Sequence, residues 1–252
     1  MKILSIPKSD LKRLGYIFLR KIGIFIVFIF VLFFDGTYFA ENYINSQIPI
    51  NILMFIGFIL MYLRAVKKIR KFMIYAVIIG FLGEYFFSII LEMYSYRLQK
   101  VPLYVPFGHA ALYGRVLIFS KDSFVKKYEN EVIQFFFLLI LLISFVYLTF
   151  LNDVFGFLMS LLVYFVFYFN KKTRLFFLTM YLIVVFLEIG GTAFGAWKWP
   201  SVAFGVFDFL PSNNPPSGIS IVYFLLDISC FLTYVLLHQK IWKRYKCIKL
   251  KK

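Results

Sequence analysis

Residues 72–96, FMIYAVIIGFLGEYFFSIILEMYSY, place a glutamate inside an apolar run and end in an aromatic pair. Residues 175–199, LFFLTMYLIVVFLEIGGTAFGAWKW, repeat this arrangement with Glu188 and the pair Trp197 and Trp199. An ionisable side chain is costly inside a membrane span, so its presence there indicates a functional site with a nearby partner. Two such glutamates at matching places predict an internal duplication that forms one shared site.

The repeat continues beyond each aromatic pair. In both copies a proline turn follows, and then a helix that opens Pro-x-Gly and carries a tyrosine seven residues after the proline. Proline is tolerated in the first turn of a helix, so this pattern predicts a helix start at the same point in each half. The residues concerned are Pro106, Gly108 and Tyr113 in the first copy, and Pro216, Gly218 and Tyr223 in the second.

The composition predicts an all-α, polytopic helical membrane protein. Hydrophobic residues make up 62% of the chain and the mean hydropathy is +0.83. Apolar runs of span length recur throughout. They predict about eight transmembrane helices in two similar four-helix halves, about 22–120 and 131–238, within a single transmembrane domain, 22–238. The runs are 22–40, 48–66, 72–93, 104–120, 131–151, 154–170, 175–196 and 217–238.

The net charge of +16 is distributed as the positive-inside rule requires. Of the 28 Lys and Arg residues, 24 lie in the termini or in alternate loops between the runs. This bias predicts an integral protein of the inner cell membrane, multi-pass, with both termini cytoplasmic. The basic N-terminal segment 1–21 and the basic tail 239–252 are then expected to contact anionic lipid headgroups, and we expect no nucleic-acid partner.

The first apolar run, from Ile22 to Phe34, is short enough for the core of a signal peptide. Residues 37–40, TYFA, lack the small-x-small pattern of a cleavage site, so we expect an uncleaved helix. Cys230 and Cys247 offer no disulfide framework.

The intramembrane polar residues predict a cavity. Glu84 and Glu188 each lie about twelve residues from the cytoplasmic end of their spans, which is about 18 Å at 1.5 Å per residue. Asp227, His109 and Arg115 fall in the outer half or the centre of the bilayer as well. Charge that is concentrated in this way indicates a site, whereas charge spread at random would not.

Carboxylic-acid chemistry is the function that these residues favour. Glu84, Ser88 and Glu92 share one helix face at i, i+4 and i+8, and Glu188 with Thr192 repeats the step. Desolvation and a second carboxyl group nearby both favour the protonated form. A dry carboxylic acid can protonate an alkene or an epoxide, and aromatic ring faces stabilise the resulting cation. We therefore predict Glu84, Glu188, Glu92 and Asp227 as catalytic residues, and Tyr94, Tyr96, His109, Tyr113, Arg115, Trp197, Trp199, Asn213, Asn214 and Tyr223 as substrate-binding residues.

Two other interpretations of the same residues are open. Glu84 could pair with Arg115 as a structural ion pair while Asp227 stabilises a hydrogen-bond network. The glutamates could also bind a metal with Glu92 and His109. The chain has no Glu-x-x-His or His-x-x-His spacing, so we expect no metal and no cofactor. It also lacks an intramembrane lysine for a retinal Schiff base, an Asp-rich diphosphate motif and a Gly-rich nucleotide loop.

Two further features concern packing. Gly191 and Gly195 form a small-xxx-small pair, which predicts that the third and seventh runs pack closely at the centre of the molecule. The segment 198–217 is rich in proline, asparagine and aromatic residues. It is expected to dip into the membrane interface, as a lid over the cavity or as an anchor.

Four segments resemble the integral-membrane carotenoid hydratases and the small membrane lycopene cyclases of bacteria. They are Gly83-Glu84, Glu92-x-Tyr94-x-Tyr96, residues 101–108 (VPLYVPFG) and residues 188–192 (EIGGT). The resemblance implies cofactor-independent acid chemistry on a polyene or another isoprenoid. It implies Glu84 and Glu188 as the proton donors, with Glu92 and Asp227 as weaker candidates.

The leading hypothesis is thus a membrane-embedded enzyme that acts on an isoprenoid or another lipid by proton transfer, as in a hydration or a cyclisation. An alternative is a small carrier or flippase in which Glu84, Arg115, Glu188 and Asp227 bind a proton, an ion or a lipid. A further alternative is a non-catalytic partner protein that uses the segment 198–217. Only the fourth and eighth runs carry Pro and Gly near their starts, which favours a fixed site over alternating access.

Overall fold

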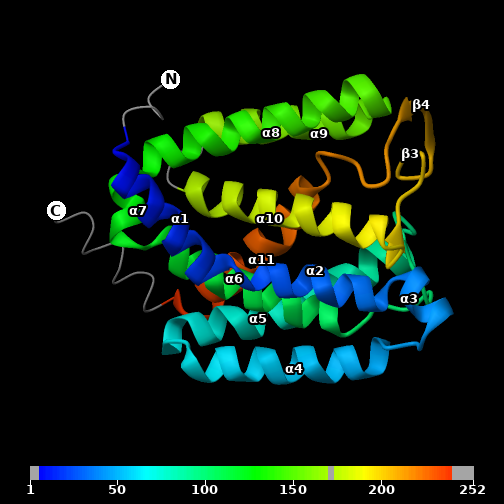
Figure 1. Ribbon diagram of the computed structural model, residues 1–252, viewed down its shortest axis with the longest axis horizontal. Helices are drawn as coiled ribbons and strands as arrows, with labels where there is room; N and C mark the ends of the chain where they lie inside the picture. Colours follow the sequence, from blue (N-terminus) through cyan, green and yellow to red (C-terminus); the bar gives the residue numbers. More distant parts are fainter. Residues whose placement is uncertain (1–5, 170–172, 240–252) are drawn as a thin grey trace.

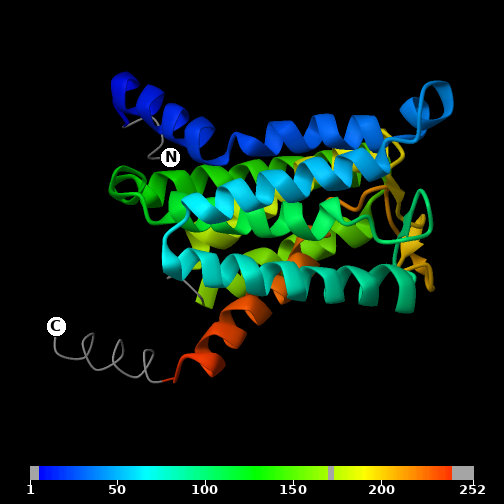
Figure 2. The same ribbon diagram turned by 90° about the horizontal axis from the view of Figure 1, so that it is seen from below.

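The computed structural model describes residues 6–169 and 173–239. The predicted basic tail therefore lies outside the described residues from position 240 onward, as do residues 1–5 of the predicted N-terminal segment. Most of the described chain is helical, and most of the long helices run roughly side by side along the longest axis of the molecule, with α11 inclined to them (Figures 1 and 2). The predicted all-α class is confirmed, with short strands only at one end of the helices.

The first part of the chain builds one group of helices (Figures 1 and 2). A 50° bend at Gly23 separates the first two of them. The elements are α1 (Lys8–Ile22), α2 (Ile24–Asp35), α3 (Thr37–Asn42), α4 (Gln47–Arg64), α5 (Lys67–Tyr85) with a π-helical turn (Phe86–Ile90), β1 (Ser95–Tyr96) and α6 (Tyr104–Ser120).

The second part of the chain runs back and forth beside the first (Figure 1). Its helices are α7 (Ser123–Lys127), α8 (Glu129–Leu151), α9 (Val154–Phe169), α10 (Arg174–Ala193) and α11 (Ser220–Leu237). Between α10 and α11 lie the short strands β2 (Trp197–Lys198), β3 (Val202–Ala203) and β4 (Phe207–Pro211).

Five of the described helices are long and apolar enough to cross a membrane: α4, α5 with its π-helical turn, α8, α10 and α11. The bent pair α1 and α2 makes a sixth if it forms one span. These lengths and compositions are consistent with a multi-pass helical membrane protein that has five or six candidate spans, fewer than the eight predicted. The other two predicted runs fold as α6 and α9, which have 17 and 16 residues.

Helices α6 and α10 form the centre of the bundle. Helix α6 packs against α1, α2, α4, α5 and α10, and α10 packs against α2, α6, α8 and α11. Small residues allow this close packing: a Cβ atom on Gly114 of α6 would lie 3.0 Å from the side chain of Met73. Helices α5 and α10 each pack against both α6 and α11. The sequence predicted that the two glutamate helices pack directly against each other. In the structure, α5 and α10 are instead connected through α6 and α11, which both of them contact.

The loops at one end of the bundle are joined by a two-stranded antiparallel sheet. Strand β1 pairs with β2, with Ser95 opposite Lys198 and Tyr96 opposite Trp197. The backbone N–H of Arg97 also donates to the carbonyl of Ala196 over 2.9 Å. Because β1 follows α5 and β2 follows α10, this pairing fixes the ends of the two glutamate helices relative to each other.

The segment expected to dip into the interface contains a hairpin of β3 and β4. Phe204 packs edge-on against Phe155 at the start of α9, with ring centroids 4.9 Å apart. Val206 and Phe209 are 71% and 81% exposed. Exposed apolar side chains at the end of a membrane bundle are typical of a segment that contacts the lipid interface.

The opposite end of the bundle carries a larger group of basic residues. Lys21, near the end of α1, pairs with Asp122, whose carboxylate also accepts hydrogen bonds from the backbone N–H groups of Phe124 and Val125 at the start of α7. The Lys21 ammonium holds the pKa of the Asp122 carboxyl below its usual range. These contacts tie α1 to the loop after α6 at this end.

The fold predicts which loops share a side of the membrane. Asn45, before α4, and Asn152, between α8 and α9, lie at the strand end of the bundle, whereas Lys127 lies at the basic end. With the basic end in the cytoplasm, Asn45→Cys and Asn152→Cys should react with a membrane-impermeant maleimide in intact cells. Lys127→Cys should react only after permeabilisation. Labelling of all three cysteines from one side would contradict this arrangement.

Candidate functional site

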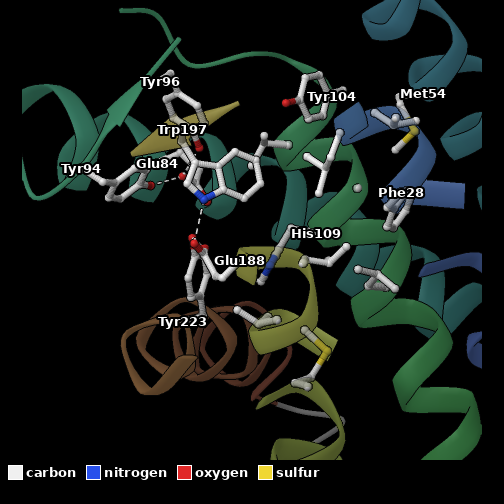
Figure 3. A pocket seen from close by; sticks show the side chains of 18 residues that line it. Phe28, Met54, Glu84, Tyr94, Tyr96, Tyr104, His109, Glu188, Trp197 and Tyr223 are labelled. Carbon is white, nitrogen blue, oxygen red and sulfur yellow. Dashed lines mark hydrogen bonds between the residues drawn. The ribbon is translucent and has the colours of Figure 1, made fainter. Parts of the chain in front are cut away.

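A cavity of about 80 Å³ lies between α2, α4, α6 and α10, beneath the two-stranded sheet. The polar side chains gather on one side of it, and apolar side chains such as Phe28 and Met54 form the other side (Figure 3). Its polar lining consists of Glu84, Tyr94, Tyr96, Tyr104, His109, Glu188, Trp197 and Tyr223. The two glutamates that the sequence singled out therefore do line one shared cavity.

Glu84 is the last buried residue of α5 and is 1% exposed. Oε2 of its carboxyl group accepts hydrogen bonds from the hydroxyl groups of Tyr94 and Tyr96, the latter over 2.6 Å. The π-helical turn begins two residues later, and within it the Ser88 hydroxyl donates to the carbonyl of Glu84 over 2.6 Å. Single π-helical turns are frequently found at functional sites.

Glu188 lies on α10 and is 3% exposed. Oε2 of its carboxyl group accepts from the indole N–H groups of Trp197 and Trp199, each over 2.8 Å. Oε1 accepts from the hydroxyl group of Tyr223 on α11, also over 2.8 Å. Both oxygens of Glu188 thus accept hydrogen bonds, and the donors are three aromatic side chains.

The two halves of the site match each other. Each glutamate accepts from two aromatic residues in the strand segment that follows its own helix, and the two strands pair. The rings also contact across the pair: the centroids of Tyr94 and Trp199 are 4.4 Å apart, and those of Tyr96 and Trp197 are 6.0 Å apart. The repeat read from the sequence therefore corresponds to one continuous aromatic and carboxyl cluster.

All five of these aromatic groups act as donors. Burial away from water raises the pKa of the Tyr94 and Tyr96 hydroxyl groups well above the usual range. Both hydroxyl groups therefore keep their protons at neutral pH and remain donors. Hydrogen bonds to a charged group contribute about 1.5–3 kcal/mol each, so the cluster is able to hold a carboxylate in apolar surroundings.

His109 and Asp227 extend the polar network away from the glutamates. His109 lines the first cavity and is stacked on Tyr223, with ring centroids 6.3 Å apart. Its Nε2 lies 3.2 Å from Oδ1 of Asp227 on α11. Asp227 in turn lines a second cavity, of about 450 Å³, which opens toward Lys68 and Lys121 at the basic end. The pair lies between the two cavities.

Three further predicted site residues, Glu92, Tyr113 and Arg115, do not line the first cavity. Glu92 has a φ of 50° after the π-helical turn and its side chain is exposed, so it does not continue the helix face of Glu84 and Ser88. Tyr113 lines the second cavity, and its hydroxyl group lies 3.5 Å from the carbonyl of Asp227. Arg115 does not pair with Glu84. Its guanidinium donates to the backbone carbonyls of the last turn of α1.

Asn213 and Asn214 form hydrogen bonds outside the first cavity. The side-chain oxygen of Asn214 accepts from the backbone N–H of Trp199 over 2.8 Å. The backbone N–H of Asn213 donates to Oδ1 of Asp153 over 3.1 Å. These residues therefore position the strand segment that carries the tryptophans, and neither lines the first cavity.

Two buried aspartates of the site region are absent from the predicted set. Asp35, at the end of α2, forms an ion pair with Arg97 over 2.8 Å and accepts from the hydroxyl group of Tyr104 over 2.7 Å. Asp153, before α9, accepts from the backbone N–H of Ser217 over 2.7 Å. Asp35 lies near the end of the first apolar run of its half and contacts the first residue of α6, whereas Asp153 follows the first run of its half and contacts Ser217, three residues before α11. The matching positions of Asp35 and Asp153 in the two halves were the signal by which the sequence could have identified them.

Gly191 has a different role from the one predicted. A Cβ atom at this position would lie 2.1 Å from the indole ring of Trp197, so the glycine makes room for that ring beside α10. Gly195 has a φ of +74° and begins the turn into β2. Close helix contact occurs instead at Gly83, where a Cβ atom would lie 2.2 Å from Leu226 of α11.

Among the residues that the structure describes, no group of three His, Cys, Asp or Glu side chains is arranged to hold a metal ion. The polar atoms around the cavity are arranged as donors toward carboxyl groups. What this arrangement provides chemically is two carboxyl groups in a largely apolar chamber, with aromatic ring faces beside them.

No family model, curated protein or solved structure matches this chain.

Gly191→Ala should disturb the site specifically. The added methyl group overlaps the indole of Trp197, which must move away from Glu188, and such overpacking costs about 1–3 kcal/mol. We expect a lower midpoint of thermal unfolding and altered tryptophan fluorescence. Gly57→Ala is the control, because a Cβ atom there has nothing within 4 Å. Equal behaviour of the two variants would show that the ring does not depend on Gly191.

Proposed function

We propose that the protein is a membrane-embedded enzyme that protonates an unsaturated, apolar lipid, such as an isoprenoid, with a carboxyl group of the first cavity. The observation that carries this proposal is the pair Glu84 and Glu188, which line one apolar chamber and are held by aromatic donors. A lipid could enter such a chamber from the bilayer, and its hydrocarbon chain would find apolar walls there.

The hydrogen bonds suggest different roles for the two carboxyl groups. Both oxygens of Glu188 accept hydrogen bonds, an arrangement that favours the carboxylate. The bonds that Glu84 accepts from Tyr94 and Tyr96 both end on Oε2, so Oε1 is the atom available to carry a proton. We assign Glu84 as the acid and Glu188 as the anion that stabilises positive charge. In pairs of carboxyl groups with different environments, one group often donates a proton while the other stays ionised.

The reaction then proceeds by proton transfer alone. Oε1–H of Glu84 gives its proton to one carbon of a C=C bond, and the other carbon becomes a cation beside the aromatic rings and the Glu188 carboxylate. In a hydration, the oxygen of a water molecule bonds to the cation and a proton from that water returns to Glu84. In a cyclisation, a second C=C bond attacks the cation and a carbon-bound proton returns instead. Glu84 is regenerated in both cases.

The proposal includes an orientation. We place the basic end of the bundle in the cytoplasm of a cell whose inner membrane holds the protein, and the cavity in the outer half of the bilayer. We count α6 and α9 as the seventh and eighth passes, packed in two similar halves. The matching positions of the two glutamates and of the two aspartates support this duplicated arrangement.

Loss of either carboxyl group should abolish the chemistry. We expect Glu84→Gln to lower turnover by about 10²–10⁴-fold, the usual contribution of a general acid. Glu188→Gln should also lower turnover, because the cation then loses the negative charge that stabilises it. The measurement is mass spectrometry of lipid extracts from cells that express each variant with the native host's lipids supplied. A hydration adds the mass of one water, and a cyclisation gives an isomer with a changed retention time.

Glu41→Gln is the matched control for this experiment, because Glu41 lies on α3 with an exposed side chain. An equal loss in Glu41→Gln would contradict a specific role for the pair. A lipid profile that is identical for the wild type and the double variant, with both proteins folded, would contradict the proposed enzyme.

The second candidate function is a proton-coupled carrier, and one observation favours it. His109 and Asp227 contact each other between the first cavity and the larger second cavity, which extends to the basic end. Protons could pass along this pair. In proteoliposomes with a pH gradient, a carrier should show proton uptake into the vesicles, and Asp227→Asn should abolish this uptake. Lipid chemistry that survives in Asp227→Asn would favour the enzyme.

A further inference from the structure

A third cavity, of about 290 Å³, lies between α1, α4, α5 and α6 at the basic end of the bundle. Three arginines line it: Arg20 on α1, Arg64 at the end of α4 and Arg115 on α6. No acidic side chain is among the described residues that line this cavity. Three positive charges thus face one space without a carboxylate among them.

Arg115 is held in place but is not neutralised. Its Nε and Nη2 donate to the carbonyls of Lys21 and Arg20, each over 2.5 Å, at the end of α1 where the helix dipole is negative. These two bonds leave Nη1 of Arg115 for another acceptor. The charge of Arg20 acts on Arg115 at the same time, and like charges repel. An anion in the cavity would remove this repulsion.

The remaining walls of the cavity are apolar. They include Ile24, Met61, Ile69, Met73 and Ile118. A soluble anion would gain nothing from such walls, whereas hydrocarbon next to an anionic group would bury apolar surface against them. The occupant that fits is therefore an amphiphile with a negative charge at one end.

The depth of the cavity agrees with this assignment. Arg64 is the last residue of α4, one of the candidate spans, so it lies where the helix leaves the hydrocarbon core. Arg115 lies five residues before Ser120, the last residue of α6. At 1.5 Å per residue, it is about 7.5 Å from that end of the helix. The guanidinium groups therefore lie at the level of lipid headgroups, and arginine binds phosphate through paired N–H donors.

We propose that this three-arginine cavity binds the phosphate group of a membrane lipid, with the start of the lipid's hydrocarbon chain against Met61, Met73 and Ile118. The site is separate from the cavity of Glu84 and Glu188 and does not depend on the function proposed for it. It also explains why a span carries Arg115 without a carboxylate partner.

The test uses the full-length protein in detergent, with dioleoylphosphatidylglycerol, dioleoylglycerol and inorganic phosphate as separate probes. Native mass spectrometry measures bound lipid, and thermal unfolding measures protection. We expect the phosphatidylglycerol to bind and to raise the unfolding midpoint. Dioleoylglycerol and inorganic phosphate should have little effect, because each lacks one half of the proposed ligand.

Two variants remove different properties of the site. Arg64→Gln deletes a charge at an exposed position, and Arg115→Lys keeps the charge but loses the planar pair of donors. Losing one charge-assisted hydrogen bond weakens binding by about tenfold, so we expect at least that change for each variant. Lys12→Gln is the control, since it deletes a charge from an exposed position on α1 that does not line the cavity.

Each other outcome would overturn the proposal. Equal binding of dioleoylglycerol would show that the arginines do not recognise phosphate. Equal protection by inorganic phosphate would assign the site to a soluble anion. An equal loss in Lys12→Gln would show that only the overall positive charge matters. Unchanged binding in both Arg64→Gln and Arg115→Lys would remove the cavity as the lipid site.

Discussion

The structure depends on satisfying two carboxyl groups that are buried in an apolar bundle. A carboxylate without hydrogen-bond donors is too costly to keep in such surroundings, and the chain supplies donors from the aromatic residues that follow each glutamate helix. Those donors reach their targets only because β1 and β2 pair across the end of the bundle. The buried charge thereby fixes the loops, and the loops fix α5 and α10, which pack against the same two neighbouring helices.

Much of this site could be predicted from the sequence because its parts are close together along the chain. Tyr94 and Tyr96 follow Glu84 by 10 and 12 positions. The two tryptophans follow the second glutamate by 9 and 11 positions. The duplication then indicated that the two clusters meet. Helical periodicity also placed Ser88 correctly beside Glu84. It failed for Glu92, because the π-helical turn changes the direction of the following residues.

The remaining polar contacts depend on tertiary structure that hydropathy does not encode. The 50° bend at Gly23 brings the end of α1 against α6, where its carbonyls accept from Arg115. A count of residues from the end of the span placed Arg115 near the centre of the bilayer, whereas its guanidinium contacts the end of α1 near the basic end of the bundle. Asp35 was missed for a similar reason, since its partners Arg97 and Tyr104 are 62 and 69 positions away.

The separation of charges within the bundle bears directly on the chemistry. Arg97, a basic residue at the strand end, is already paired with Asp35, and Arg115 faces the third cavity. No Lys or Arg is among the described residues that line the first cavity. A fixed cation therefore cannot neutralise Glu84 there, and only a proton, the ring of His109 or a positively charged ligand can do so. The predicted structural ion pair between Glu84 and an arginine is therefore not formed in this cavity.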